Sequence, residues 1–473
     1  MSTIIGLFYS IFIIVFAGRS VFSLKILELK DEPYGIMLPL YFLAGSIVLS
    51  LYMLLLFFLR VPFSVLTISS PFLLYMVFYA HANYRSFIGK LNMSLNYFLG
   101  LARAGFDGKS ILRTLFFFLI FLVISMIFLQ NSIIPIFIGD SYAHWFFKAK
   151  AIFVSGTIPG DILTNMNFFY TRTDYPLLVP LNLAWIAMCT GGWSDTITRS
   201  FFSFCFLSMI VFLYFSLKKY IDENLALYGA FIASVVPCFV RESVNGYVDI
   251  IVAILTMVSA ILLFNWFTRT RKTGYLLLSA IFIGGAAWTK NDGIALFAAM
   301  SLALLAYLLS NLNKKELGLA TASSRLFAFI AAGGIVFLPF RIFVGALGIR
   351  NHMISGSDQI LSFTSNLWRV PYIFNQFLYE FFLNTSIWLY FWIFFFLMIF
   401  VGRKRIFNSD AKYILLFMLL YSAFLFYVYM VTALGSSVEG LKGNLEELER
   451  LLLHIAPTAV FVIMLSFNKE RSL

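Results

Sequence analysis

The sequence predicts an all-α integral membrane protein that crosses the bilayer many times. The chain has 473 residues, of which 61% are hydrophobic and only 12% are charged, and its mean hydropathy is +0.91. A soluble domain carries roughly twice that share of charge. Apolar runs of about 16–22 residues recur along the whole length, and each is long enough to cross a ~30 Å hydrocarbon core. These runs are too continuous for the alternating strands of an outer-membrane barrel.

The basic residues predict the topology, because short loops rich in Lys and Arg face the cytoplasm. Clusters of this kind occur at Arg85, Lys90, Arg103, Lys109 and Arg113, and again near 218–219, 269–272, 314–325, 403–412 and 469–471. Placing all of them inside gives about thirteen alternating spans, with the N-terminus outside and the C-terminus inside. The spans lie near 3–17, 36–58, 62–80, 111–130, 198–217, 224–241, 248–267, 275–289, 292–310, 326–343, 381–401, 412–432 and 452–467. The net charge of +12 is thereby assigned to membrane anchoring, and no nucleic-acid partner is expected.

One apolar segment does not fit the alternation. Pro176–Cys189 is apolar, but at about 14 residues it is too short for an ordinary span. If it crossed the membrane, every later basic cluster would change sides. The segment is therefore expected to be a juxtamembrane or re-entrant helix on the outer face, where such structure can line a cavity or lie in the interface.

The sequence GDSYAHWFFKAK at 139–150 places several polar side chains where a span ends. Charge at the edge of a bilayer is costly and often functional. Asp140 could act as a general base toward an acceptor hydroxyl or amine, or it could cap the helix that begins near Ser141. Lys148 and Lys150 suit a phosphate leaving group, or they snorkel from an interfacial helix.

Two further predicted outward turns carry charge. Asp249 enters a span directly in GYVDIIVAI, close to Glu242, which could equally pair with Arg241. A buried carboxylate must be paired or functional, so Asp249 could position the acceptor, bind a divalent cation or hold a lysine. Lys290, in AWTKNDG, is either a phosphate ligand or satisfied by its acidic neighbour.

The last predicted span begins near a pair of cationic residues. Arg450 and His454 are four residues apart and share a helix face, which suits a phosphate or pyrophosphate or anchors the helix end in the interface. The acidic run Glu446, Glu447 and Glu449 is expected to be a solvated helix face. His144 is expected to be an interfacial polar residue, since the spacing of zinc ligands is absent around it. No metal site is predicted.

Five motifs in this order resemble the glycosyltransferase C superfamily, in particular its family-39-like enzymes. The motifs are GDSYAHWFFKAKAIF at 139–153, DYPLLVPL at 174–181, GYVDIIVAI at 246–254, GGAAWTKNDG at 284–293 and ERLLLHIAP at 449–457. Relatives of this kind are the dolichyl-phosphate-mannose protein mannosyltransferases and the lipid A aminoarabinose transferases. The resemblance implies that Asp140 is the catalytic base, that Asp249 or Glu242 is the second-loop carboxylate, and that Lys148 or Lys150, Lys290 and Arg450 contact the donor phosphate.

The sequence therefore predicts an inverting glycosyltransferase that uses a polyprenyl-phosphate sugar on the extracytoplasmic face of the plasma (inner) membrane. The acceptor is a glycan, lipid or protein, and a divalent cation is left open as cofactor. Residues 1–110 form an N-terminal three-span segment of unknown role, and residues 111–473 form the catalytic domain. Two alternatives remain, namely a glycan polymerase or ligase with a diphosphate-linked donor, which would rely on Arg450 and His454, and a lipid or solute transporter.

Overall fold

The protein is described by a computed structural model over residues 3–29, 32–82, 111–136, 139–349, 363–431 and 438–467. All secondary-structure elements in these ranges are helices. The predicted class, a polytopic all-α membrane protein, is thereby confirmed. The basic clusters at 85–109 and 469–471, which were predicted to face the cytoplasm, lie outside the described ranges.

The apolar helices correspond to the predicted spans. Eight helices in the described ranges are long and apolar enough to cross a membrane, and two bent helix pairs raise this number to as many as ten. Four shorter apolar helices are Val65–His81, Leu178–Thr190, Thr273–Thr289 and Phe391–Val401. The long helices and the bent pairs match ten of the approximately thirteen predicted spans. Val65–His81 and Thr273–Thr289 coincide with two more, whereas Phe391–Val401 covers only the second half of the span predicted at 381–401, because Tyr379–Leu383 and Thr385–Trp388 are separate short helices. The remaining shorter apolar helix, Leu178–Thr190, is the segment expected not to cross.

The chain divides into two compact units. Unit 1 comprises Met1–Pro159, Leu177–Val235 and Ser243–Gly246, and unit 2 comprises Gly160–Pro176, Val236–Glu242 and Tyr247–Leu473. The helices of unit 1 are α1 (Thr3–Phe22), α2 (Tyr34–Phe58), α3 (Val65–Ala82), α5 (Ile111–Ile133), η1 (Ser141–Phe146), α6 (Phe147–Ser155), α8 (Leu178–Thr190), α9 (Asp195–Thr198), α10 (Ser200–Leu217) and α11 (Glu223–Val235). Helix α12 (Pro237–Asn245) begins in unit 2 and ends in unit 1.

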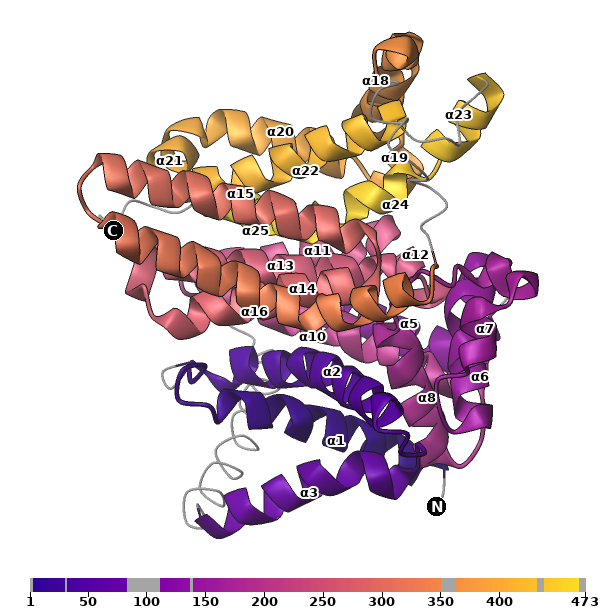
Figure 1. Ribbon diagram of the computed structural model, residues 1–473. Coiled ribbons are helices and arrows are strands. Elements are labelled where there is room, and N and C mark those ends of the chain that lie inside the picture. The colour runs from indigo at the N-terminus through magenta and orange to yellow at the C-terminus, as the bar shows by residue number, and fades with distance from the viewer. Residues whose placement is uncertain are drawn as a thin grey trace. The chain divides into compact units, whose positions relative to one another are not determined.

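In unit 1, α8 runs across the ends of α1 and α2 (Figure 1). Helices α1 and α2 approach closely at Gly18 and Gly45, where an added Cβ would collide with the backbone of the other helix. Eleven of the residues of α8 are buried, from Leu178 to Cys189. A short, buried crossing helix fits the expectation of a helix that does not span. Because α1 and α2 pack on α8 and α10, the N-terminal helices are structurally part of this unit, and the functional boundary predicted at residue 110 stays a prediction.

Unit 2 is built around α13, all of whose residues are buried. Its helices are α7 (Gly160–Thr164), η2 (Met166–Thr171), α13 (Asp249–Asn265), η3 (Trp266–Thr270), α14 (Thr273–Thr289), α15 (Asp292–Asn313), α16 (Leu319–Ala346), η4 (Thr364–Arg369), α18 (Val370–Leu378), η5 (Tyr379–Leu383), α19 (Thr385–Trp388), α20 (Phe391–Val401), α21 (Arg403–Asn408), α22 (Ala411–Val431), α23 (Val438–Leu445), α24 (Leu448–Leu453) and α25 (Ala456–Leu465). Helices α14 and α25 pack directly on α13, and α14 also contacts α15 and α16.

The two ends of the unit 2 bundle carry different side chains. At one end, Arg271 donates to Asn311 over 3.2 Å and pairs with Glu316 over 3.3 Å. Arg405 of α21 donates to the carbonyl of Ser466 over 2.7 Å, just beyond α25. This is the end predicted to face the cytoplasm. The opposite ends of α13, α14 and α25 carry the residues singled out as functional.

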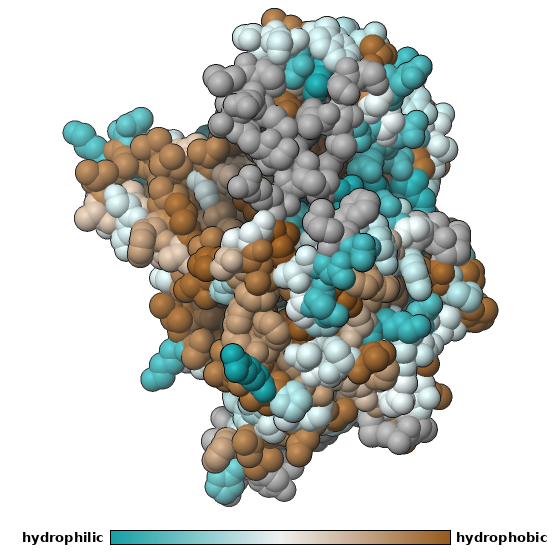
Figure 2. All heavy atoms as spheres, turned by 45° about the vertical axis from the view of Figure 1, so that its right-hand side comes forward, coloured by the Kyte–Doolittle hydropathy of each residue, from teal (hydrophilic) through white to brown (hydrophobic). Residues whose placement is uncertain are grey.

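The outer surface of the helices is apolar, as a bilayer requires. Figure 2 displays brown, apolar side chains over much of the face that it presents. On α16, the exposed apolar residues include Leu319, Phe327, Ile335 and Ile342. The helices therefore present hydrocarbon on the outside and keep their polar groups at the ends or in the interior.

Candidate functional site

Asp140 immediately precedes a π-helical turn. The turn η1 covers Ser141–Phe146, and the side chain of Asp140 makes no capping hydrogen bond to it. The structure thus disfavours the alternative in which Asp140 serves as a helix cap. A π-helical turn is rare and occurs frequently at functional sites. The half-buried carboxylate of Asp140 therefore keeps the candidate role of a base.

The two lysines after Asp140 lie in different environments. Lys148 is only 2% exposed, and its Nζ lies 5.8 Å from the centroid of the Trp145 ring. Lys150 is exposed. His144 is half-buried and meets Trp145 edge-on, with 6.4 Å between ring centroids. Snorkelling into water accounts for Lys150, but not for the buried Lys148.

In unit 2, three of the predicted residues meet. The Oδ1 atom of Asp249 accepts a hydrogen bond from Lys290 Nζ over 2.8 Å and lies 2.9 Å from Nε2 of His454. The Nδ1 atom of His454 lies 2.7 Å from the hydroxyl of Tyr421. With an ionised Asp249, Nε2 of His454 carries the proton and Nδ1 accepts from Tyr421. The aspartate, the histidine and the tyrosine are almost completely buried, so the network lies in the interior of unit 2.

Lys290 is neutralised by two carboxylates. Besides Asp249, Asp292 Oδ2 lies 3.0 Å from its Nζ. Burial alone would lower the pKa of Lys290, but the charges of Asp249 and Asp292 raise that pKa well above its ordinary value. The lysine is therefore a fixed cation. Of the alternatives left open by the sequence, the structure realises the one in which Asp249 holds a lysine.

A second polar group surrounds the turn that carries Lys290. Asn291 Nδ2 donates to Asp174 Oδ2 over 2.6 Å, and Arg341 donates to the Asn291 side-chain oxygen and to the Asp174 carbonyl over 3.3 Å. Next to Asp174, burial raises the pKa of the Tyr175 phenol above its ordinary value. The sequence analysis did not single out Arg341, although an arginine near the end of an apolar span was a visible signal.

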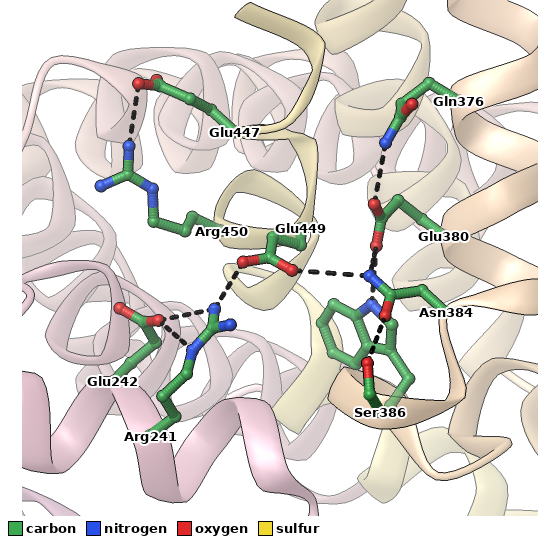
Figure 3. A network of polar contacts seen from close by, with 10 residues as sticks. Arg241, Glu242, Gln376, Glu380, Asn384, Ser386, Glu447, Glu449 and Arg450 are labelled. Carbon is green, nitrogen blue, oxygen red and sulfur yellow. Dashed lines mark hydrogen bonds and ion pairs between the residues drawn. The ribbon is translucent and has the colours of Figure 1, made fainter. Parts of the chain in front are cut away.

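Glu242 belongs to a network that includes a residue expected to be solvated (Figure 3). Its Oε1 accepts from Arg241 Nε over 2.9 Å, and Arg241 Nη2 also donates to Glu449 Oε1 over 2.6 Å. The expectation that the acidic run forms a solvated helix face is correct for Glu446 and Glu447, which are exposed. It is wrong for Glu449, whose carboxylate is half-buried and pairs with Arg241.

Arg450 lies beside this network. Its Nη2 is 2.9 Å from Glu447 Oε1, and its guanidinium carbon lies 4.7 Å from the centroid of the Tyr247 ring. Arg450 and His454 were expected to act as a pair. In the structure they have different partners, since His454 faces Asp249 and Tyr421. Within the described ranges, no three His, Cys, Asp or Glu side chains are arranged to hold a metal ion.

The fold and these networks define a multi-pass helical membrane protein with polar side chains gathered at helix ends. Residues 174–340 match the family model of the dolichyl-phosphate-mannose-protein mannosyltransferases. The chain matches no curated protein and no solved structure. The family match is consistent with a member of the glycosyltransferase C superfamily, so the resemblance seen in the sequence is confirmed. The matched range contains Asp174, Glu242, Asp249 and Lys290, ends one residue before Arg341, and indicates a membrane glycosyltransferase.

Proposed function

We propose that the protein transfers a sugar from a polyprenyl-phosphate carrier to an acceptor on the extracytoplasmic face of the membrane. The observation that carries this proposal is the family match over residues 174–340, whose description names a lipid-phosphate-linked sugar. Nucleotide sugars stay in the cytoplasm, so an outward enzyme needs a donor that has already crossed the membrane. A polyprenyl-phosphate sugar meets this need, with its tail between apolar helices.

In the proposed reaction, the Asp140 carboxylate takes the proton of an acceptor hydroxyl. The acceptor oxygen attacks the anomeric carbon while the bond from that carbon to the phosphate oxygen breaks. Polyprenyl phosphate leaves with the bonding electron pair, and one direct displacement inverts the anomeric centre. The half-buried position of Asp140 before a π-helical turn supports its role as the base, because a positioned side chain is what general-base catalysis requires.

The leaving phosphate needs cations, and the contacts rank the four candidates. A phosphate would have to compete with two carboxylates for Lys290. Arg450 is balanced by Glu447, whose side chain is 52% exposed, so this pairing is weak. Lys148 is buried and Lys150 is exposed. Within unit 2 we therefore assign the phosphate first to Arg450, and we assign Asp249 and His454 to holding Lys290 in place. Lys148 and Lys150 of unit 1 stay candidates for the same role.

The test is donor turnover by the purified protein in lipid nanodiscs. Polyprenyl-phosphate hexoses and pentoses are supplied without a further acceptor, so that water takes the acceptor's place and receives the sugar, and released polyprenyl phosphate is measured by mass spectrometry. We expect release by the wild type and a loss of about 100- to 10,000-fold for Asp140→Asn. Asp161→Asn changes an exposed aspartate of α7 and serves as the matched control. Turnover of diphosphate-linked donors alone would favour the polymerase alternative, and near-normal turnover by Asp140→Asn would remove Asp140 from the mechanism.

A further inference from the structure

Seven side chains of unit 2 form one continuous polar network, here called the Arg241 network. It runs from Glu242 through Arg241 to Glu449, and then through Asn384 to Glu380 (Figure 3). Asn384 Nδ2 donates to Glu449 Oε2 over 3.5 Å and to Glu380 Oε2 over 2.9 Å. Glu380 also accepts from Gln376 Nε2 over 3.0 Å and from Trp388 Nε1 over 3.1 Å. Three segments that are distant in the sequence thus supply three carboxyls, two amides, one guanidinium and one indole.

The network contains a buried acceptor atom whose partner is missing. Glu242 is 1% exposed, yet its Oε2 has no hydrogen-bond partner among the described residues. In Figure 3 this oxygen is directed away from Arg241, toward the side of the network on which Arg450 lies. A carboxylate oxygen buried without a partner is costly, and such groups in a native structure call for a missing ligand or water.

A second buried polar atom lies next to the network. The Nε1 atom of Trp392 also has no partner among the described residues, and the Trp392 ring packs edge-on against Trp388 at 5.4 Å between centroids. Trp388 is the residue that donates to Glu380. One unsatisfied acceptor and one unsatisfied donor therefore occur in and beside a single polar network.

The helix that carries Glu380 is itself unusual. Residues Tyr379–Leu383 form the π-helical turn η5, directly after α18. A π-helical turn is less favourable than α-helix and is found mostly where function requires it. This turn places Glu380 within reach of Gln376 and Asn384, each four residues away. The π-helical turn and the polar contacts of Glu380 therefore occur at the same place in the chain.

We propose that the Arg241 network is the acceptor subsite and that it binds the hydroxyl groups of a carbohydrate. This inference rests on the proposed function, since it names the class of acceptor for that reaction. Carboxylates and side-chain amides are directional groups that hydrogen-bond hydroxyls. Glu242 Oε2 accepts from one acceptor hydroxyl, and the half-buried amide of Gln376 at the edge of the network contacts another.

The hydrogen-bond inventory favours a hydroxyl over the other acceptor chemistries. An ammonium group has three donors, whereas the other oxygens of the network's three glutamates already accept from Arg241, Asn384, Gln376 or Trp388. An ionised phosphate or carboxylate brings acceptors only and cannot donate to Glu242 Oε2. A hydroxyl brings one donor and can also accept, which matches one free acceptor atom in a site that contains donors.

The test uses the full-length protein in lipid nanodiscs on a glycan array. The array carries neutral hexose, pentose and N-acetylhexosamine glycans, with aminoalkyl groups and Ser/Thr peptides printed beside them. We expect the wild type to bind neutral glycans and Glu242→Gln to bind them about tenfold or more weakly, because one of the two carboxyl oxygens is replaced by an amide donor. Gln376→Ala, at the edge of the network, should weaken binding without affecting folding, which is checked by thermal unfolding.

Glu446→Gln is the matched control, because this exposed glutamate lies in the same acidic run as Glu449 but outside the network. It should bind glycans as the wild type does. Three outcomes would each overturn the inference. The first is binding to amines or peptides only, and the second is no glycan binding. The third is glycan binding that Glu242→Gln and Gln376→Ala leave unchanged. Release of polyprenyl phosphate without an acceptor is measured on the same preparation. That release tests the proposed function separately, so a failure of one can be told from a failure of the other.

Discussion

Asp249 and Lys290 are both buried, so removing either charge breaks a buried ion pair, although Lys290 keeps Asp292 and Asp249 keeps His454 as a neighbour. Breaking a buried pair by removing one partner costs about 3–5 kcal/mol, whereas replacing both with apolar groups of similar size is often close to neutral. We therefore expect Asp249→Asn and Lys290→Met each to lower the thermal stability strongly. The double variant should lose less than the sum of the two single losses.

The measurement is a double-mutant cycle on the free energy of unfolding in detergent. The coupling between Asp249 and Lys290 should be large, because the two side chains are 2.8 Å apart. Asp161→Asn combined with Lys290→Met provides an uncoupled reference, since Asp161 is exposed. Additive losses for Asp249→Asn and Lys290→Met would show that the pair does not exist in the folded protein.

Arg450 offers a test of the donor site at the same scale. Its guanidinium both faces Glu447 and stacks over Tyr247. A lysine keeps the charge but supplies neither the planar fork nor the stacking. We expect Arg450→Lys to weaken the binding of a polyprenyl-phosphate sugar by about 10- to 150-fold, the equivalent of one charge-assisted contact of roughly 1.5–3 kcal/mol.

Donor affinity is measured by native mass spectrometry, and Arg403→Lys is the control, because Arg403 is exposed at the opposite end of unit 2. Wild-type affinity in Arg450→Lys would place the phosphate elsewhere and would strengthen the polymerase or transporter alternative.

At the scale of elements, Arg199 connects the start of α10 to the end of α5. Its Nη2 donates to the carbonyl of Gln130 over 3.1 Å and to the carbonyl of Ile134, and the residue is 1% exposed. A cation that donates to the last carbonyls of a helix also complements the helix dipole. Arg199 thereby fixes the end of the helix that precedes Asp140 in the chain.

We expect Arg199→Ala to destabilise the protein by about 1.5–3 kcal/mol, the value of a hydrogen bond made by a charged donor. Arg199→Lys should recover part of the loss, because one ammonium can reach a carbonyl but cannot span several. The readout is thermal unfolding, with the exposed Arg403→Ala as control. Equal stability of Arg199→Ala and the wild type would exclude this capping role.

The helices of this chain were predictable, but the partners of its charged side chains were not. Apolar length predicted the long helices, because a bilayer imposes a minimum length on any crossing helix, and the basic clusters together with its short length predicted that Leu178–Thr190 does not cross. In contrast, the contact between Asp249 and His454 joins residues that are 205 positions apart. No local pattern encodes such a pair. Glu449 was expected in water for the same reason, since its partner Arg241 lies 208 positions away.

At the scale of the molecule, the charge alternation predicted which segments share a side of the membrane. Unit 2 brings together Arg241, Glu380 and Glu449 in one network, and Asp249 and Lys290 in another. These residues come from four segments that were all assigned outside. Arg271 and Arg405, which were assigned inside, lie at the opposite helix ends. The basic loops therefore predicted which helix ends of unit 2 lie together. The face of the membrane that each end meets stays a prediction.

Cysteine labelling determines the side directly. The three native cysteines, Cys189, Cys205 and Cys238, are buried, so their background reaction with a membrane-impermeant maleimide should be low.

In sealed, right-side-out vesicles, we expect Thr157→Cys and Ser436→Cys to be labelled from outside. Asn313→Cys, on the exposed end of α15, should react only after the membrane is permeabilised. This pattern follows from the positive-inside rule, because Lys314 and Lys315 follow Asn313. The orientation is reversed if Asn313→Cys reacts from outside or if Thr157→Cys reacts only after permeabilisation. The proposed active site would then face the cytoplasm, where nucleotide sugars are available.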